Sequence, residues 1–259
     1  MAIITFTSDF GFRDHYVAAV KAKIFQFNPS IKVVDISHEI DHFNIAHGAF
    51  VLGSVFRDFP KGTVHLVAIN TQSKNKDRLV AVKMEEHFFV GADNGIFSLI
   101  SDKMPIVVEL IYDKTNITSF PERNILANTA VALASGASLY DQGKHLQDGL
   151  NKKLNRQTRV TKNKIEGHVA HKDIYGNLIT NIDLDTFLSV RQDRKFYVNF
   201  GRESVERIYD TYSKVDEGDC IAIFNSMNLL EIAIVNGNGS ELLGLDYDSP
   251  ISIEFYPEV

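Results

Sequence analysis

The sequence predicts an α/β N-terminal domain with a largely parallel sheet, followed by a small all-β barrel domain. In the first part of the chain, short β-branched runs alternate with helical patterns, as in parallel sheets covered by helices. In the last part, short strands separated by turn residues follow one another. A basic stretch with few apolar residues lies between them. We therefore expect an α/β domain at 1–150, a linker at 151–164 and a β-barrel domain at 165–259.

The elements of the N-terminal domain follow from two patterns. β-branched and aromatic runs favour strands, whereas apolar residues at spacings of three and four indicate helices. The last helix is rich in alanine, which suggests close packing against its neighbours. In chain order, we expect strands at 3–7, 32–36, 64–69, 79–84, 88–90 and 106–110, and helices at 16–27, 45–56, from Asn94, and from 124 to about 140.

Residues 151–164 read NKKLNRQTRVTKNK, with six Lys or Arg and no acid. So few apolar groups cannot bury enough surface to form a core element. A patch that binds nucleic acid is the alternative interpretation. A short basic run in a chain of net charge −6, however, favours a solvent-exposed linker between the domains. After it, we expect short strands at 166–170, 178–182, 196–200, 203–209, 220–224, 230–235 and 251–255.

Composition narrows the function classes. A chain of 259 residues, 44% of them hydrophobic, can bury a sizeable core. The sequence pI of about 5.8 leaves no global basic field for nucleic acid or an anionic membrane. The chain opens on the strand-like run Ile3–Phe6, and no apolar run approaches the roughly 20 residues of a membrane span. We expect a cytoplasmic protein that binds a small ligand.

The cysteine and histidines argue against a metal site. Cys220 is the only cysteine, which excludes an intramolecular disulfide and a CxxC metal knuckle. Nine histidines are present, but none is arranged as HExxH, and His38, His42 and His47 have no evident set of Cys or carboxylate partners. The sequence also lacks GxGxxG, P-loop and GxSxG motifs, which argues against dinucleotide, nucleoside-triphosphatase and serine-hydrolase functions.

The segment TFTSDFG, residues 5–11, places Asp9 just past the first predicted strand. Ligands of α/β sheets bind outside the carboxyl ends of strands. Asp9 is therefore positioned to accept hydrogen bonds from vicinal hydroxyls such as those of ribose. An alternative is that Asp9 only caps the loop, and its position alone leaves both open.

Two further segments combine polar groups with turn residues. In DIYGNLITN, residues 173–181, a glycine beside Tyr175 lets a planar ligand approach the backbone, and Asp173 could bind an ammonium group. Gly-Asn pairs also form tight turns, so a plain turn without a ligand is the alternative interpretation of this segment. The segment NSMN, residues 225–228, could contact the edge of a base or form a plain hairpin turn.

Taken together, several motifs resemble those of the S-adenosylmethionine (SAM) hydroxide adenosyltransferase family, which includes fluorinating and chlorinating enzymes. They are SDFG, VVDISHEI, FPKGTVHLVAI, FFVGADNGIFSL, YGNLITNI and LLEIAIVNGNGSELLGL, and the resemblance covers nearly the whole chain. It implies a homotrimer of two-domain subunits, with SAM between the N-terminal domain of one subunit and the C-terminal domain of the next. It also implies displacement at the ribose C5′ of SAM, with no separate cofactor and no general acid, because methionine leaves as a neutral thioether.

The resemblance assigns the binding residues position by position. Asp9 matches the acid that contacts ribose, and Asp173 the acid that meets the methionine ammonium. Tyr175 stands where the family has Phe, and Asn177 is the amide that follows it. The loop that contacts adenine corresponds to Asn225 and Ser226.

The catalytic segments depart from the family pattern. Hydrolysing members carry Asp-Pro-Gly-Val-Gly-Thr-x-Arg-Arg after the strand at 64–69, and this chain has NTQSKNKDR. Asn70 replaces the activating Asp, Asp77 the first Arg, and only Arg78 is kept. In the second segment, Thr-Phe-His-Gly-Arg-Asp becomes SFPERN, so Pro121, whose side chain cannot transfer a proton, replaces the His.

Glu122 replaces a glycine or serine next to the place of the nucleophile. A carboxylate there would repel fluoride or chloride, which argues against halogenation. Glu122 could instead act as general base toward water, with Lys74, Lys76 or Arg78 lowering the cost of the negative charge. The residues expected nearest the reacting carbon are Asn70, Glu122 and Arg123.

The sequence leaves open whether this protein is an enzyme. One hypothesis is a SAM hydrolase that releases adenosine and methionine. The alternative is a catalytically inactive family member that binds SAM or adenosine. A third possibility is an oligomeric scaffold without a ligand.

Overall fold

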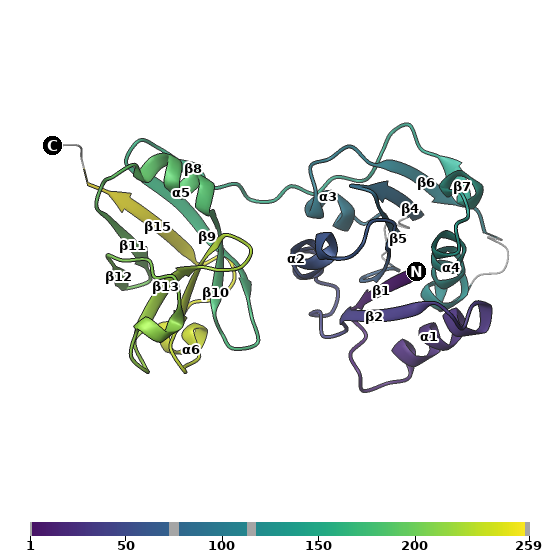
Figure 1. Cartoon of the computed structure of the whole chain (residues 1–259), viewed down its shortest axis with the longest axis horizontal. Helices are drawn as coiled ribbons and strands as arrows, with labels where there is room; N and C mark the ends of the chain where they lie inside the picture. Colours follow the sequence, from purple (N-terminus) through teal and green to yellow (C-terminus); the bar gives the residue numbers. More distant parts are fainter. Residues whose placement is uncertain (1, 73–77, 113–117, 257–259) are drawn as a thin grey trace. The chain divides into compact units, whose positions relative to one another are not determined.

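The computed structural model describes residues 2–72, 78–112 and 118–256. Contacts within the chain divide it into two compact units, Met1–Asn155 and Arg156–Val259, each with its own sheet (Figure 1). The dividing point falls inside the basic stretch 151–164. Over the described parts of the chain, no helix is long and apolar enough to cross a membrane.

The N-terminal unit is built on a sheet of order β2-β1-β3-β5-β4-β6-β7. The pairs β2–β1, β1–β3 and β3–β5 are parallel, and the pairs β5–β4, β4–β6 and β6–β7 are antiparallel. The strands are β1 (Ile3–Ser8), β2 (Lys32–Ser37), β3 (Val64–Ala68), β4 (Leu79–Met84), β5 (His87–Ala92), β6 (Ile106–Leu110) and β7 (Gly143–His145).

The sheet is therefore mixed, and the expected parallel arrangement holds for the β2-β1-β3-β5 half. The change of direction arises between β4 and β5, which are joined by only Glu85 and Glu86. Both residues have positive φ, 50° and 65°. A two-residue hairpin turn can only connect antiparallel strands, whereas a parallel pair needs a long crossover.

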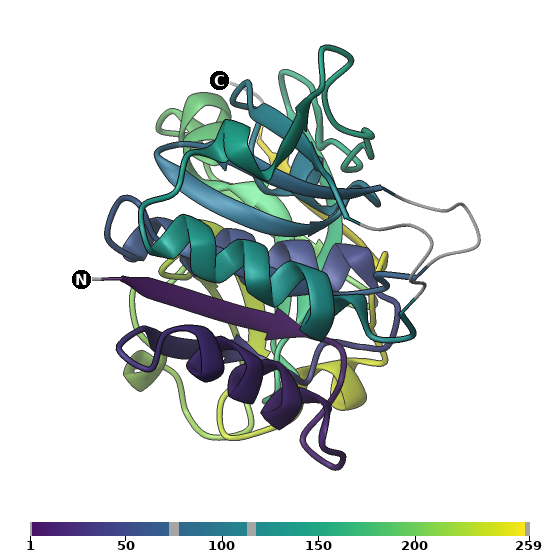
Figure 2. The same ribbon diagram turned by 90° about the vertical axis from the view of Figure 1, so that its right-hand side faces the viewer.

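Helices cover both faces of this sheet. On one face, α1 (Tyr16–Phe27) and α4 (Ala127–Ala134) pack together, and Figure 2 shows them running beside β1. On the other, α2 (Ile45–Val55), which is followed by the short η1 (Phe56–Asp58), contacts α3 (Ile96–Ile100). Alternate residues of a strand point to opposite faces of the sheet, so each face has its own apolar side chains. Each pair of helices packs on one face, and the unit therefore has two separate hydrophobic cores.

The helix expected from 124 to about 140 is shorter in the structure. It starts with a π-helical turn, η2 (Glu122–Leu126), and α4 ends at Ala134. Gly136, with φ of 95°, ends the helix: its N–H donates to Leu133 O at 3.0 Å, and Ala137 N–H donates to Ala132 O at 3.0 Å. Such a left-handed glycine satisfies the last carbonyls and stops the helix. A 3₁₀ turn, η3 (Leu139–Gln142), follows.

The C-terminal unit is an antiparallel, barrel-like sheet of order β12-β11-β15-β9-β10-β14-β13, with β8 paired to β9. A bridge between Tyr209 and Ile223 joins the chain after β12 to β13, so the two ends of the sheet approach each other. The strands are β8 (Arg159–Val160), β9 (Lys164–Lys172), β10 (Leu178–Asp183), β11 (Phe196–Phe200), β12 (Glu203–Val205), β13 (Cys220–Phe224), β14 (Leu229–Ile234) and β15 (Pro250–Phe255).

The expectation of an all-β unit is wrong in one respect, because helices α5 (Leu184–Arg191) and α6 (Gly239–Leu243) are present, with a 3₁₀ turn, η4 (Tyr212–Lys214). Asp183 caps α5, since its Oδ1 accepts a hydrogen bond from Thr186 N at 2.8 Å. Phe187 then packs its ring 5.1 Å from that of Phe196, inside the barrel core. The strand expected at 203–209 ends at Val205.

Candidate functional site

Asp9 follows β1 and is 8% exposed. Its Oδ2 accepts hydrogen bonds from the backbone N–H of Phe43 at 2.9 Å and of Asn70 at 3.2 Å. Its own N–H donates to Ala68 O at 3.3 Å. One carboxylate thus joins the loops that follow β1, β2 and β3, at the carboxyl ends of three parallel strands, where α/β sheets bind ligands.

The backbone of Asn70, rather than its side chain, makes this contact. Asn70 has a φ of 45°, a left-handed conformation that asparagine tolerates better than most residues. The side chain of Asn94 holds the loop in place: its Nδ2 donates to Ile69 O at 2.9 Å and to Asn70 O at 3.3 Å. The turn after β5 therefore shapes the loop after β3.

Glu122 begins the π-helical turn before α4 and is 5% exposed. Burial raises the pKa of this carboxyl, and the nearby charge of Asp9 raises it further. Its own backbone N–H and the Thr71 hydroxyl lower the pKa without outweighing burial. Glu122 is therefore a buried carboxyl near Asp9, with a pKa raised above that of an exposed glutamate.

The segment that carries Glu122 is tied to its neighbours on both sides. Gln72 Nε2 donates to Ser119 O at 3.0 Å, which connects the segment to the loop after β3. The ring of Phe120 lies 5.9 Å from that of Phe10, beside Asp9. Arg123, in contrast, is exposed.

Arg78 is engaged elsewhere, which corrects the expectation that it could lower the cost of charge on Glu122. Its Nε donates to Asp93 Oδ2 at 2.8 Å, and Asp93 is buried. Its other nitrogens donate to Asp148 Oδ2 at 3.1 Å and Gly149 O at 2.6 Å. A guanidinium held by these partners fixes the chain around 148–149. The other candidates, Lys74 and Lys76, lie outside the described residues, as does Asp77.

A second cluster lies in the C-terminal unit, around Asp173. Its Oδ1 accepts hydrogen bonds from the N–H of Tyr175 and of Asn177, both at 2.9 Å, and its Oδ2 accepts one from Asn177 Nδ2 at 2.9 Å. Gly176 has a φ of 83°, and a Cβ there would lie 1.9 Å from Asn238 Oδ1. The segment is therefore a tight turn capped by Asp173, and only glycine fits at its tip.

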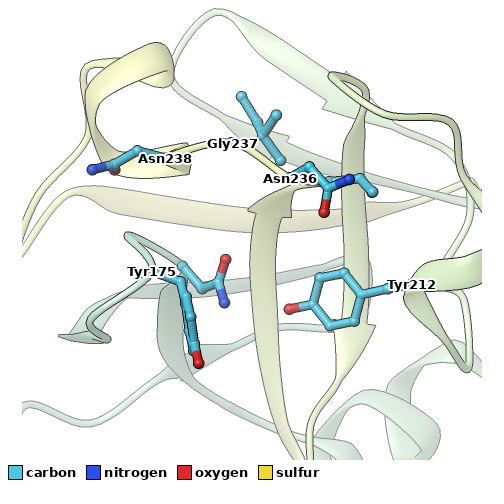
Figure 3. Close-up of a pocket in the computed structure, with 8 residues that line it drawn as sticks. Tyr175, Tyr212, Asn236, Gly237 and Asn238 are labelled. Carbon is cyan, nitrogen blue, oxygen red and sulfur yellow. The ribbon is translucent and has the colours of Figure 1, made fainter.

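This turn borders a pocket of about 490 Å³. Figure 3 shows the ring of Tyr212 across the pocket from Tyr175, with the Asn236–Asn238 turn beside them. Two rings and several amides suit a planar, polar ligand. The lining residues are Tyr175, Asn177, Tyr212, Ile234, Val235, Asn236, Gly237 and Asn238.

Glu231, a buried residue of β14, connects this pocket to the 225–228 segment. Its Oε1 accepts a hydrogen bond from the hydroxyl of Tyr212, and its Oε2 accepts one from Asn225 Nδ2 at 3.0 Å. Burial raises the pKa of Tyr212, and the charges of Glu231 and Asp173 raise it further. Asn225 Oδ1 also accepts from Met227 N at 3.0 Å, so Asn225 caps the hairpin turn, while Ser226 is exposed.

Each of the two clusters lies in a segment that matches a domain model of the same family. The family models described as the SAM hydroxide adenosyltransferase N-terminal and C-terminal domains match residues 4–143 and 167–252. The chain belongs to the SAM hydroxide adenosyltransferase family.

Relatives in this family match over most of the chain. The (R)-S-adenosyl-L-methionine hydrolase of Methanocaldococcus jannaschii is 31% identical, over 97% of this chain and 95% of its own. The fluorinase of Actinoplanes sp. (strain N902-109) is 22% identical, over 70% of this chain and 71% of its own. The crystal structure of an uncharacterized conserved protein from Thermotoga maritima superposes with a TM-score of 0.87 at 31% identity, covering 96% of this chain and 99% of that one.

Of the site residues expected from the family resemblance, Asp9 and Asn70 are joined by a hydrogen bond, and the charge of Asp9 acts on Glu122 in the same unit. In the other unit, Asp173 binds Tyr175 and Asn177, which line the pocket. The expectation missed the pocket residues Tyr212 and Asn236–Asn238. The asparagines belong to the quoted VNGNGS motif, whereas Tyr212 lies in a turn with no motif around it.

The titratable groups of the described residues do not form a metal cluster. No three or more His, Cys, Asp or Glu side chains among them lie close enough together to hold an ion. Cys220, at the start of β13, is partly buried.

Proposed function

We propose that this family member hydrolyses SAM to adenosine and methionine, with Glu122 as general base. The observation that carries the proposal is the buried Glu122 beside Asp9. The similarity to the Methanocaldococcus hydrolase, which spans more of the chain than that to the fluorinase, supports water as the nucleophile. A carboxylate next to the reacting carbon also favours water over a halide anion.

The reaction balances without an added cofactor. The oxygen of water forms a bond to the ribose C5′ while the C5′–S bond breaks, and its electron pair stays on sulfur. Methionine leaves as a neutral thioether, so no acid has to protonate it. Glu122 takes the proton of the attacking water, and the positive sulfonium favours the ionised form of Glu122 when SAM is bound.

The remaining residues bind the ligand in this proposal. Asp9 accepts hydrogen bonds from the ribose hydroxyls. The N–H of Asn70 holds the Asp9 carboxylate in place. Asp173 meets the methionine ammonium, with Tyr175 and Asn177 along the pocket. Ser226 and Asn225 contact adenine, and Arg123 stays a predicted neighbour of the reacting carbon without a structural partner assigned to it.

A homotrimer with sites at subunit interfaces is part of this proposal. The two halves of the candidate site belong to different units of the chain. Each half carries exposed apolar side chains: Phe12 and Phe43 beside Asp9, and Ile174 and Tyr175 beside Asp173. Apolar groups around a site indicate a surface that a ligand or a partner covers. The cytoplasmic location stays a prediction of the sequence.

One observation favours the alternative, a catalytically inactive protein that binds SAM or adenosine. Asn70 and Pro121 stand where hydrolysing relatives are expected to carry Asp and His, and neither side chain can transfer a proton. In this alternative the pocket and Asp9 still bind the ligand, while Glu122 has no proton to accept.

The deciding experiment incubates stoichiometric protein with SAM in H₂¹⁸O and follows adenosine and methionine by mass spectrometry. The hydrolase predicts both products together, with one ¹⁸O in adenosine, and their loss in Glu122→Gln. Glu86→Gln, a change at an exposed glutamate, is the matched control and should leave turnover intact. Intact SAM with a raised melting temperature indicates the binding protein, and an unchanged melting temperature indicates a scaffold.

A further inference from the structure

A buried serine and histidine lie directly beside Asp9. Ser8 ends β1 and His38 follows β2, and both are 0% exposed. Ser8 Oγ lies 2.7 Å from His38 Nδ1, a hydrogen bond between residues 30 positions apart. The candidate site described above assigns no role to either residue.

The charges around His38 indicate the direction of this hydrogen bond. Its Nε2 lies 3.1 Å from Oδ1 of Asp35 without the alignment of a hydrogen bond, and Asp35 Oδ2 accepts from Lys21 Nζ at 2.5 Å. Burial lowers the pKa of His38, and its contact with Asp35 opposes this without reversing it, so the imidazole is neutral. The proton of a neutral imidazole belongs on the nitrogen that faces the carboxylate. Nδ1 is then the acceptor, and Ser8 donates to it.

A Ser-His-Asp sequence of contacts suggests a nucleophilic triad, but the geometry argues against one. In such triads, Nε2 contacts the serine and Nδ1 the aspartate, whereas here the two nitrogens are exchanged. Ser8 is also fully buried, so no substrate can reach its hydroxyl. The contacts among Ser8, His38 and Asp35 therefore have a role other than nucleophilic catalysis.

His38 holds the Asp9 loop at both ends. Its side chain binds Ser8, and its carbonyl oxygen accepts a hydrogen bond from Gly11 N at 2.8 Å. Ser8 Oγ in turn accepts from Phe10 N at 3.4 Å. These three bonds surround Asp9, whose Oδ2 must meet two backbone N–H groups from other loops.

We propose that His38 is a positioning residue, which orients Asp9 through Ser8 and Gly11 for the vicinal hydroxyls of an adenosyl ligand. The ligand part of this inference rests on the proposed function of Asp9. The orientation of Asp9 by His38 can be tested without a ligand.

The same sheet supplies a matched control. Thr5 Oγ1 lies 2.7 Å from His65 Nδ1, and both residues are 0% exposed. Burial also lowers the pKa of His65. This pair, however, lies in the middle of β1 and β3, away from Asp9. Loss of either imidazole removes the same kind of buried hydrogen bond, and only one of the two adjoins the site.

The test compares His38→Leu with His65→Leu. In His38→Leu, we expect the N–H groups of Phe43 and Asn70 to exchange with deuterium more than tenfold faster, because Asp9 is no longer held against them. We also expect SAM affinity, measured by calorimetry, to fall more than tenfold. In His65→Leu, both quantities should stay within about twofold of the parent. His38→Asn, whose amide oxygen can accept from Ser8, should recover part of the affinity.

The outcomes separate this inference from the proposed function. If the parent protein does not bind SAM, the proposed function fails, and the exchange rates still decide whether His38 orients Asp9. Parental exchange rates and affinity in His38→Leu would overturn the inference, as would equal losses in both leucine variants. If these variants do not fold, Ser8→Ala and Thr5→Val provide the same comparison with smaller changes.

Discussion

Single side chains of the candidate site differ sharply from their immediate neighbours. Glu122 is buried beside Asp9, while Arg123, the next residue, is exposed. Successive side chains of a helical turn point in different directions, so Glu122 faces the core while Arg123 faces solvent. Binding and proton transfer are therefore tested best by single substitutions at Asp9 and Glu122.

Asp9→Asn should weaken SAM binding by at least tenfold while the fold is kept. The amide can replace only part of the hydrogen-bonding capacity of a carboxylate that already accepts two backbone N–H groups. Titration calorimetry with SAM measures this, and Asp14→Asn, at an exposed position of the same loop, is the control. Equal affinities for the two variants would remove Asp9 from the ligand site.

The pH dependence of hydrolysis follows from the raised pKa of Glu122. A general base works in its ionised form, so kcat/KM should rise with pH through that pKa and then level off. Because the sulfonium of bound SAM favours the carboxylate, the midpoint for kcat should lie at lower pH than the midpoint for kcat/KM. Steady-state rates between pH 4 and 9 test this, and a kcat/KM that does not fall toward pH 4 would contradict Glu122 as base.

At the level of elements, short turns decide where site residues lie. The two-residue turn between β4 and β5 reverses the sheet, and the capped turn at 173–177 builds one wall of the pocket. Gly176 allows two parts of that wall to approach each other, since a Cβ there would meet the side chain of Asn238.

Gly176→Ala should destabilise the C-terminal unit more than Gly62→Ala destabilises the N-terminal unit. The two glycines have nearly the same φ, 83° and 84°, so the backbone strain is alike. A Cβ at Gly176 meets Asn238 Oδ1 at 1.9 Å, whereas a Cβ at Gly62 meets nothing within 4 Å. We expect an extra cost of about 1–3 kcal/mol, as for other overpacked sites. Calorimetric unfolding measures it, and equal costs would show that Asn238 moves aside freely.

For the molecule as a whole, assembly and acid stability are the properties to test. The two clusters of candidate site residues belong to two units of the chain, and the proposed function requires a second subunit to complete each site. The core of the N-terminal unit also contains a buried histidine, His65, whose burial favours the neutral form.

The assembly prediction is a trimer in solution. Light scattering coupled to gel filtration should give three times the subunit mass of 29.1 kDa. Replacing exposed Phe43 by Asp should weaken the trimer and SAM binding together, and Met104→Asp, at another exposed apolar residue, should affect neither. A monomer that binds SAM with full affinity would contradict sites shared between subunits.

The acid-stability prediction concerns His65. Burial lowers the pKa of His65 to about 3, and repulsion by His87 adds to this. Unfolding returns its pKa to about 6.5, so the unfolded state binds an extra proton between these values. The stability from neutral His65 is complete above pH 6.5 and falls by at most about 1.4 kcal/mol per pH unit as pH drops toward 3. The free energy of unfolding, measured with urea at several pH values, should depend less steeply on pH in His65→Leu than in the parent. His145→Leu, at an exposed histidine, should keep the parental pH dependence.

The sequence by itself determined the family, the alternation of strands and helices before residue 112, and the position of Asp9 after the first strand. These features depend on local periodicity and on contiguous motifs, which a single chain displays directly. The helix α5 was predictable in principle, since Asp183 is an N-cap residue followed by a short helical run.

Only the tertiary structure decided which distant residues meet. Glu231 joins Asn225 to Tyr212, which lines the pocket. Arg78 pairs with Asp93 instead of Glu122, and Ser8 binds His38. Such contacts bring together residues far apart in the chain, and no local pattern records their partners. The mixed direction of the sheet has the same origin, because turn geometry and long-range pairing, rather than strand composition, set it.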